Sequence, residues 1–171
     1  HMFVGARSTP PRLAAVLICD RRILYSDMEP SQEVMRQFKP RGDCHIRSLE
    51  LLAIAFGLPT FCEQLRGRNL VVFSDNTGAE HATTKGGSKE WDHSCIAHCI
   101  CALQLRIGLW LERVPSKDNI SDDPSREQYE LLERLGAINV PARLFDIFGS
   151  SQTLQVLSRS FEFLWQGMDM E

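Results

Sequence analysis

The sequence contains no long hydrophobic run, no excess of basic residues and no paired cysteine motif. No apolar stretch approaches the roughly 20 residues that cross a bilayer, and no signal-peptide pattern opens the chain, so we expect no membrane partner. Lys and Arg total 19 against 22 Asp and Glu, giving a net charge of −3. This balance argues against a dedicated high-affinity nucleic-acid binder, but not against an enzyme that handles a polyanion through bound cations. Six cysteines without a CxxC pair indicate buried thiols in a reducing, intracellular setting.

The composition that is present is that of an ordinary globular protein, 43% hydrophobic and 24% charged over 171 residues. Residues 3–148 are interpreted as one α/β domain. Residues 149–171 form a C-terminal extension whose apolar residues recur at helical spacing. We expect this extension to be a helix packed on the domain, and a contact with a neighbouring domain or a second copy is the alternative.

Apolar spacing predicts the order of the secondary-structure elements. Antiparallel hairpin strands come first and parallel strands with crossover helices follow, which predicts a mixed sheet with helices packed on it. Residues 27–45 carry prolines and mixed charge and are expected to form a loop with at most a short helix. The last helix is expected to begin at Pro124 with Asp123 as its cap. The expected strands are 3–4, 13–19, 23–26, 70–73 and 109–114, and the expected helices are 46–65, 91–106 and 124–135.

Three carboxylates occupy positions that a purely structural role does not readily explain. Glu50 lies in an apolar helical stretch, where a lone acid is costly to bury. Asp75 follows the strand at 70–73, where α/β sheets usually bind ligands, and Asp122 lies in the loop before the last helix. The simpler interpretations are an exposed helix acid for Glu50 and a helix cap for Asp75. If the three converge, their mutual repulsion favours Mg²⁺ or Mn²⁺ and suits two-metal phosphodiester hydrolysis.

Four segments in a fixed order carry a family resemblance: RSLELLAI, VVFSDNTGA, TTKGGSKEWD and VPSKDNISDDPSR. Together they resemble the ribonuclease H domain of retrotransposon reverse transcriptases, of the gypsy-like and DIRS-type elements, over residues 3–148. The resemblance implies an RNase H-like mixed five-stranded sheet, three antiparallel then two parallel strands, with helices on both faces. It also implies that the domain cleaves the RNA strand of RNA–DNA hybrids with two bound Mg²⁺ or Mn²⁺ ions. The partner that it implies is a polymerase domain in the same polyprotein. In this family Glu50, Asp75 and Asp122 match the second, third and fourth acidic ligands.

The first acidic ligand of the family is missing, because Gly5 stands where an Asp is expected. Its loss should weaken both metal sites, so the chain is expected to be impaired or inactive as written. An inactivating change, a degenerate copy and a different alignment of the first strand are all open as explanations. The alternative function is a catalytically dead RNase H-like module that serves as a binding or scaffolding domain. A resolvase or integrase on the same fold is disfavoured by the NISDDPSR segment.

Substrate contacts are expected beside these acids, since a hybrid is held mostly through its phosphates. Arg41 and Arg47 lie just ahead of Glu50, and a solvated surface is the alternative role for every candidate. The predicted substrate-binding residues are Asn76, Thr77, Lys85, Lys89 and Arg47.

A zinc site is the other chemistry to consider. Cys95, His98 and Cys99 share one face of the helix at 91–106. No second CxxC or HxxxH completes a tetrahedral set, so packed thiols are the favoured interpretation.

Overall fold

The computed structural model describes residues 1–75, 89–104, 107–145 and 147–148. Its strands are β1 (Met2–Ser8), β2 (Pro11–Cys19), β3 (Arg22–Met28), β4 (Leu70–Ser74), β5 (Leu109–Arg113) and β6 (Ile138–Asn139). Its α-helices are α1 (Gln32–Gln37), α2 (Ile46–Thr60), α3 (Cys62–Leu65), α5 (Trp91–Gln104), α6 (Asp122–Ser125) and α7 (Glu130–Arg134). A 3₁₀ turn spans Ser116–Asp118. Residues 76–88, which include most of the TTKGGSKEWD segment, and the C-terminal extension predicted to be a helix, 149–171, lie outside the described residues.

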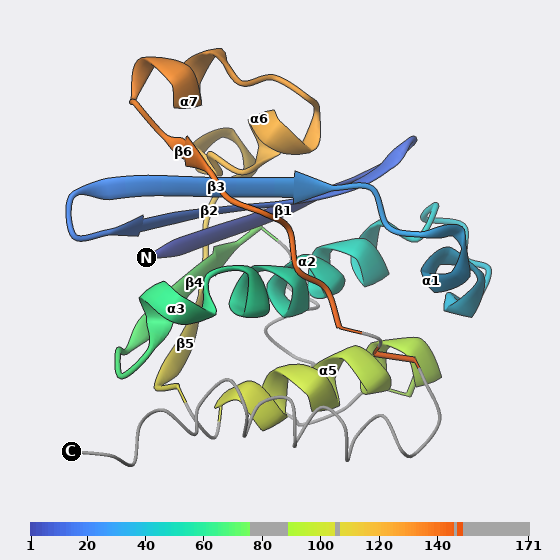
Figure 1. Cartoon of the computed structure of the whole chain (residues 1–171). Helices are drawn as coiled ribbons and strands as arrows, with labels where there is room; N and C mark the ends of the chain where they lie inside the picture. The colour runs from blue at the N-terminus through green and yellow to red at the C-terminus, as the bar shows by residue number, and fades with distance from the viewer. Residues whose placement is uncertain (76–88, 105–106, 146, 149–171) are drawn as a thin grey trace.

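The strands form one mixed sheet in the order β5-β4-β1-β2-β3-β6 (Figure 1). β1, β2 and β3 pair antiparallel, whereas β4 pairs parallel with β1 and β5 pairs parallel with β4. The α/β class and the mixed sheet are therefore confirmed. The predicted count of five strands is wrong, because the short β6 pairs parallel with the outer edge of β3.

Two predicted helices are divided in the structure. The helix predicted for 46–65 ends at Thr60, next to Pro59, and α3 begins at Cys62. The helix predicted from Pro124 is two short helices separated by Glu127, whose φ of 61° is incompatible with a continuous right-handed helix. α6 also begins at Asp122, so Asp123 lies in its first turn and is not the cap.

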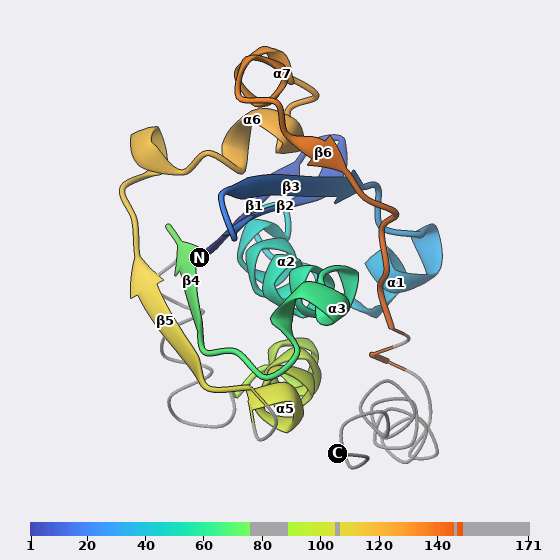
Figure 2. The same cartoon turned by 60° about the vertical axis from the view of Figure 1, so that its left-hand side comes forward.

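α2 forms the centre of the hydrophobic core. Residues 51–60 are all buried, as expected for a helix that is apolar on every side. α2 packs against β1 and β2 on one side and against α5 on another (Figure 2). A Cβ at Gly57 would lie 2.8 Å from Met2 Sδ and 3.2 Å from Ala15 Cβ. Gly57 therefore allows α2 to lie close to the two strands and sets the distance between the helix and the sheet.

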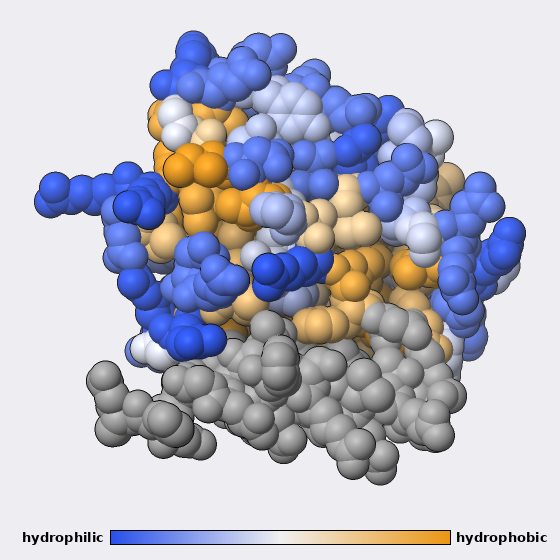
Figure 3. All heavy atoms as spheres, viewed as in Figure 1, coloured by the Kyte–Doolittle hydropathy of each residue, from blue (hydrophilic) through white to orange (hydrophobic). Residues whose placement is uncertain are grey.

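The opposite face of the sheet is covered by α6, which contacts β1, β2 and β3. Helices thus lie on both faces, with α6 and α7 above the sheet and α2 and α5 below it in Figure 1. On the side shown in Figure 3, hydrophilic residues cover most of the margin and hydrophobic residues gather in the middle and below α7. Among the described residues, no helix combines the length and apolar character that a membrane crossing requires.

Candidate functional site

The three predicted acids come from three separate elements that meet at one end of the sheet. Glu50 lies in the second turn of α2, Asp75 follows β4, and Asp122 is the first residue of α6. The parallel pairing of β1 and β4 aligns Phe3 with Phe73, so that Gly5 is level with Asp75. We call Glu50, Asp75 and Asp122 the carboxylate site.

The electrostatics of the carboxylate site reflect this convergence. Burial of Glu50 and the negative charges of Asp75 and Asp122 raise the pKa of Glu50 from 4.5 to about 7. Burial, followed by the charge of Asp75, raises the pKa of Asp122 from 3.8 to about 6. Both effects disfavour the charged form of a carboxyl group. Glu50 is therefore partly protonated at neutral pH.

Two polar side chains that the sequence did not single out orient the carboxylates. Ser116 Oγ donates a hydrogen bond of 2.7 Å to Asp75 Oδ2. Asn119 Nδ2 donates to the carbonyl oxygen of Val4 at 3.0 Å and to Asp122 Oδ1 at 3.2 Å. Asn119 thereby joins β1 to the start of α6. The one available signal was its position three residues before Asp122 in a polar loop.

The surroundings of Gly5 are too crowded for a side chain. A Cβ at this position would lie 2.8 Å from Ser121 Oγ, 2.9 Å from Asp122 Oδ1 and 3.3 Å from the carbonyl carbon of Ser121. Ser121 is fully buried, and its hydroxyl donates to Asn119 Oδ1 at 2.7 Å, so it is not free to turn away. A Cβ at position 5 would therefore lie directly beside the Asp122 carboxylate.

The donor set suits a hard divalent cation. Carboxylate oxygens are the ligands that Mg²⁺ and Mn²⁺ prefer, and a cation would offset the repulsion that raises the pKa of Glu50. Within the described residues, no three His, Cys, Asp or Glu side chains are already gathered as a ligand set. A cation would therefore have to draw the carboxylates closer together.

A cleft lies beside Asp122, which is the one member of the carboxylate site among its lining residues. Its volume is ≈ 400 Å³, and its walls combine basic and acidic side chains with apolar ones. The lining includes Ser116, Lys117, Asn119, Ile120, Arg126 and Leu131. Arg126 also forms an ion pair of 3.4 Å with Asp122 Oδ2.

The predicted substrate-binding residues are only partly described. Asn76, Thr77 and Lys85 lie outside the described residues. Lys89 is exposed just before α5, and the Arg47 side chain is 70% exposed, 3.9 Å from Asp43. The charge of Arg47 lowers the pKa of Glu50, which places Arg47 within electrostatic range of the carboxylate site.

Arg41 was considered as a substrate contact, with a solvated surface as the alternative, but its side chain is largely buried. Its guanidinium points inward and binds the buried carboxylate of Asp92 through two hydrogen bonds, of 2.6 and 2.8 Å. Nothing in the local sequence signals this pairing, because the two residues are 51 positions apart.

The cysteine and histidine group on α5 does not form a ligand set. Cys99 is buried, and burial raises the pKa of its thiol to about 12, which keeps it protonated. His98 on the same helix is exposed, and none of the six cysteines, which all lie in the described part of the chain, forms a disulfide. A protonated thiol is a poor metal ligand, in agreement with the interpretation of packed thiols.

A comparison with protein-family models finds none that matches this chain, and no curated protein matches it significantly.

Proposed function

We propose that this chain is the ribonuclease H-type domain of a retroelement reverse transcriptase and hydrolyses the RNA strand of RNA–DNA hybrids. The observation that carries the proposal is the convergence of Glu50, Asp75 and Asp122 from three elements, where burial and neighbouring carboxylates raise the pKa values of Glu50 and Asp122. The order of motifs and the mixed sheet with antiparallel strands first are consistent with it. The polymerase domain of the same polyprotein is the proposed partner, in an intracellular compartment where thiols stay reduced.

Each residue of the site has a defined part in this proposal. Glu50, Asp75 and Asp122 would hold the divalent cations, and Ser116 and Asn119 keep two of the carboxylates in place by hydrogen bonding. Mg²⁺ or Mn²⁺ bound there supplies an activated water and stabilises the leaving oxygen.

Contacts to the phosphate backbone would come from residues around the carboxylate site. Arg47 and Lys89 are exposed and available to phosphates, and Asn76, Thr77 and Lys85 belong to the same proposal. With a net charge of −3, the isolated domain is expected to bind a hybrid weakly and to rely on the polymerase domain for grip.

Gly5 limits the activity that this proposal allows. Three carboxylates instead of four leave less negative charge to hold two cations, so we expect slow cleavage that Mn²⁺ supports better than Mg²⁺. The close packing of Ser121 and Asp122 against Gly5 also favours a second candidate function, a non-catalytic RNase H-like module that binds hybrids or scaffolds the polymerase. In that case the role of Gly5 is to allow the close packing of Ser121 and Asp122 against β1.

Cleavage of a labelled RNA–DNA hybrid in Mg²⁺ and in Mn²⁺ tests the proposal. The wild-type chain is compared with Glu50→Gln, which removes a proposed ligand, and with Glu29→Gln, a matched change at an exposed acid beyond β3. We expect RNA-strand cleavage that Glu50→Gln abolishes and Glu29→Gln leaves unchanged. Equal cleavage by wild type and Glu50→Gln contradicts the assignment of the site.

Gly5→Asp and Gly5→Ala separate the two candidate functions. If the fourth carboxylate is all that is missing, Gly5→Asp gains activity and Gly5→Ala does not. If the wild-type chain and both Gly5 variants bind the hybrid and none of them cleaves it, the non-catalytic module replaces the enzyme as the function. The alanine variant reports the cost of the Cβ alone, so that a folding defect is not mistaken for a chemical one.

A further inference from the structure

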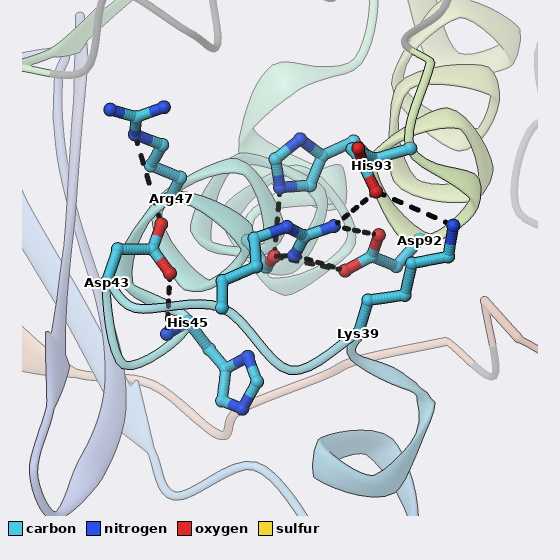
Figure 4. Close-up of polar contacts among 9 residues, drawn as sticks. Lys39, Asp43, His45, Arg47, Asp92 and His93 are labelled. Atoms are coloured by element: carbon cyan, nitrogen blue, oxygen red, sulfur yellow. Dashed lines mark hydrogen bonds and ion pairs between the residues drawn. The ribbon is translucent and has the colours of Figure 1, made fainter.

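A buried polar cluster lies where the start of α2 meets the start of α5, and we call Arg41, Ser48, Asp92 and His93 the Arg41 cluster (Figure 4). Ser48 Oγ contacts each of the other three residues of the cluster, and we call it the hub. It lies 2.9 Å from Arg41 Nη1, 3.2 Å from Asp92 Oδ2 and 2.9 Å from His93 Nε2. In Figure 4, Asp92 and His93 point from α5 towards the beginning of α2. The cluster thus joins the loop before α2, α2 itself and α5.

Arg41 and Asp92 form an ion pair inside the cluster that is joined by two hydrogen bonds. Asp92 is fully buried, and the Arg41 side chain is only 17% exposed. Burial alone would raise the pKa of Asp92, but the hydrogen bonds and charge of Arg41 outweigh it and lower the pKa to about 2. Two parallel N–H···O bonds use the planar fork of the guanidinium, which an ammonium group does not reproduce.

The first turn of α2 is joined to the loop before it and to α5 by this cluster. Its N-cap residue, His45, has a φ of 64° and makes no side-chain capping bond. Ser48 lies in the first turn, two residues before Glu50, and its buried hydroxyl carries the contacts to Arg41 and Asp92. A shift of Ser48 would therefore move Glu50 with it. Asp92 holds the other end of this contact, because it lies in the first turn of α5, which packs against α2.

We propose that Arg41 is a positioning residue for the carboxylate site: by holding Ser48 and Asp92 together it sets the separation of Glu50 from Asp75, and with it the affinity for a divalent cation. The part of this inference that concerns cations rests on the proposed function. The part that concerns the position of Glu50 does not. Arg41 touches neither the cation nor the substrate in this role, and it acts only through Ser48 and the helix that carries Glu50.

The test uses Arg41→Lys, which keeps the positive charge and removes the fork. Its matched control is Arg68→Lys, because Arg68 makes the same two-bond pair with Asp20, at 2.8 and 2.7 Å, on the exposed surface. Ser48→Ala is the second variant and serves if Arg41→Lys does not fold, since it removes the hub hydroxyl without leaving an unpaired charge. Crystal structures without added cation give the distance between the carboxylates of Glu50 and Asp75, and calorimetry with Mn²⁺ gives the dissociation constant.

We expect Arg41→Lys to change the Glu50–Asp75 distance by about 1 Å and to weaken Mn²⁺ binding by at least about fivefold, with Arg68→Lys unchanged in both. A merely structural role would lower the thermal stability of Arg41→Lys while leaving the distance and the dissociation constant as in the wild type. That outcome overturns the proposal. If the wild-type chain binds no Mn²⁺, the proposed function fails, and the distances in the crystal structures still decide the positioning role.

Discussion

Replacing Glu50 with glutamine is expected to make the protein more stable at alkaline pH, the opposite of what most substitutions at a buried position do. The reason is the cost of keeping the Glu50 carboxylate charged where it is partly buried and next to Asp75 and Asp122. In the unfolded chain the carboxyl group ionises near its ordinary pKa of 4.5, and in the folded chain it keeps its proton until about pH 7. The folded state therefore binds more protons between these values, and the free energy of unfolding falls as the pH rises through that window.

The size of this effect follows from the two pKa values. A difference of about 2.5 pK units, at 1.36 kcal/mol for each, corresponds to about 3 kcal/mol. Glu50 is only partly buried, so solvent screening reduces the expected value to about 2 kcal/mol. Glutamine mimics the protonated acid and carries none of this cost. Glu50→Gln should thus be about 2 kcal/mol more stable than wild type at pH 8 and within about 0.5 kcal/mol of it at pH 4.5.

Urea unfolding at pH 4.5 and at pH 8, in the presence of a chelator, measures the two differences. Glu29→Gln is the control, because it removes one charge from an exposed position and should shift neither. A Glu50→Gln protein that is equal to or less stable than wild type at pH 8 would refute the electrostatic picture of the carboxylate site. So would a stabilisation that is as large at pH 4.5 as at pH 8.

Three further outcomes follow from the same contacts. The affinity for Mn²⁺ should rise between about pH 6 and pH 7 and level off above that, because Glu50 and Asp122 must lose their protons to bind a cation. Calorimetry that finds no dependence of the affinity on pH would contradict this. Asn119→Ala should lower the free energy of unfolding in urea by about 2 kcal/mol, because it removes the hydrogen bonds to the Val4 carbonyl and to Asp122. A loss below about 0.5 kcal/mol would contradict the role of Asn119 in joining β1 to the start of α6. Gly5→Ala should lower the free energy of unfolding by about 1–3 kcal/mol, because the added Cβ overpacks the space beside Ser121 and Asp122. A variant that unfolds at the same temperature as the wild-type chain would show that this space is open.

Much of the fold could be predicted because its elements have clear periodicity. The short apolar runs of β2 and β3 and the three-and-four spacing of α2 are local signals, and these elements appear in the structure, whereas only residues 3–4 of the longer β1 were predicted. β6 was missed because two residues are too short for any period. The division between α6 and α7 was missed because Glu127 adopts a left-handed conformation that its residue type does not announce.

The three acids of the carboxylate site were identifiable for a similar reason. Each stands at a position that local pattern defines: inside an apolar helix, after a buried strand, or before a proline-marked helix. The orienting contacts were not identifiable, because they join segments that are distant in the chain. Ser116 reaches Asp75 across 41 positions, and Asn119 reaches Val4 across 115. Such contacts exist only once the sheet has brought the segments together.

Binding of Mn²⁺ to the full chain at pH 8, followed by calorimetry, tests most directly whether Glu50, Asp75 and Asp122 form a cation site. Asp122→Asn is the comparison, because the amide keeps the size of the side chain and removes its charge. We expect saturable binding by the wild-type chain and binding weaker by at least about tenfold in the variant. Identical isotherms for the two proteins, or no binding by the wild-type chain, would contradict the assignment.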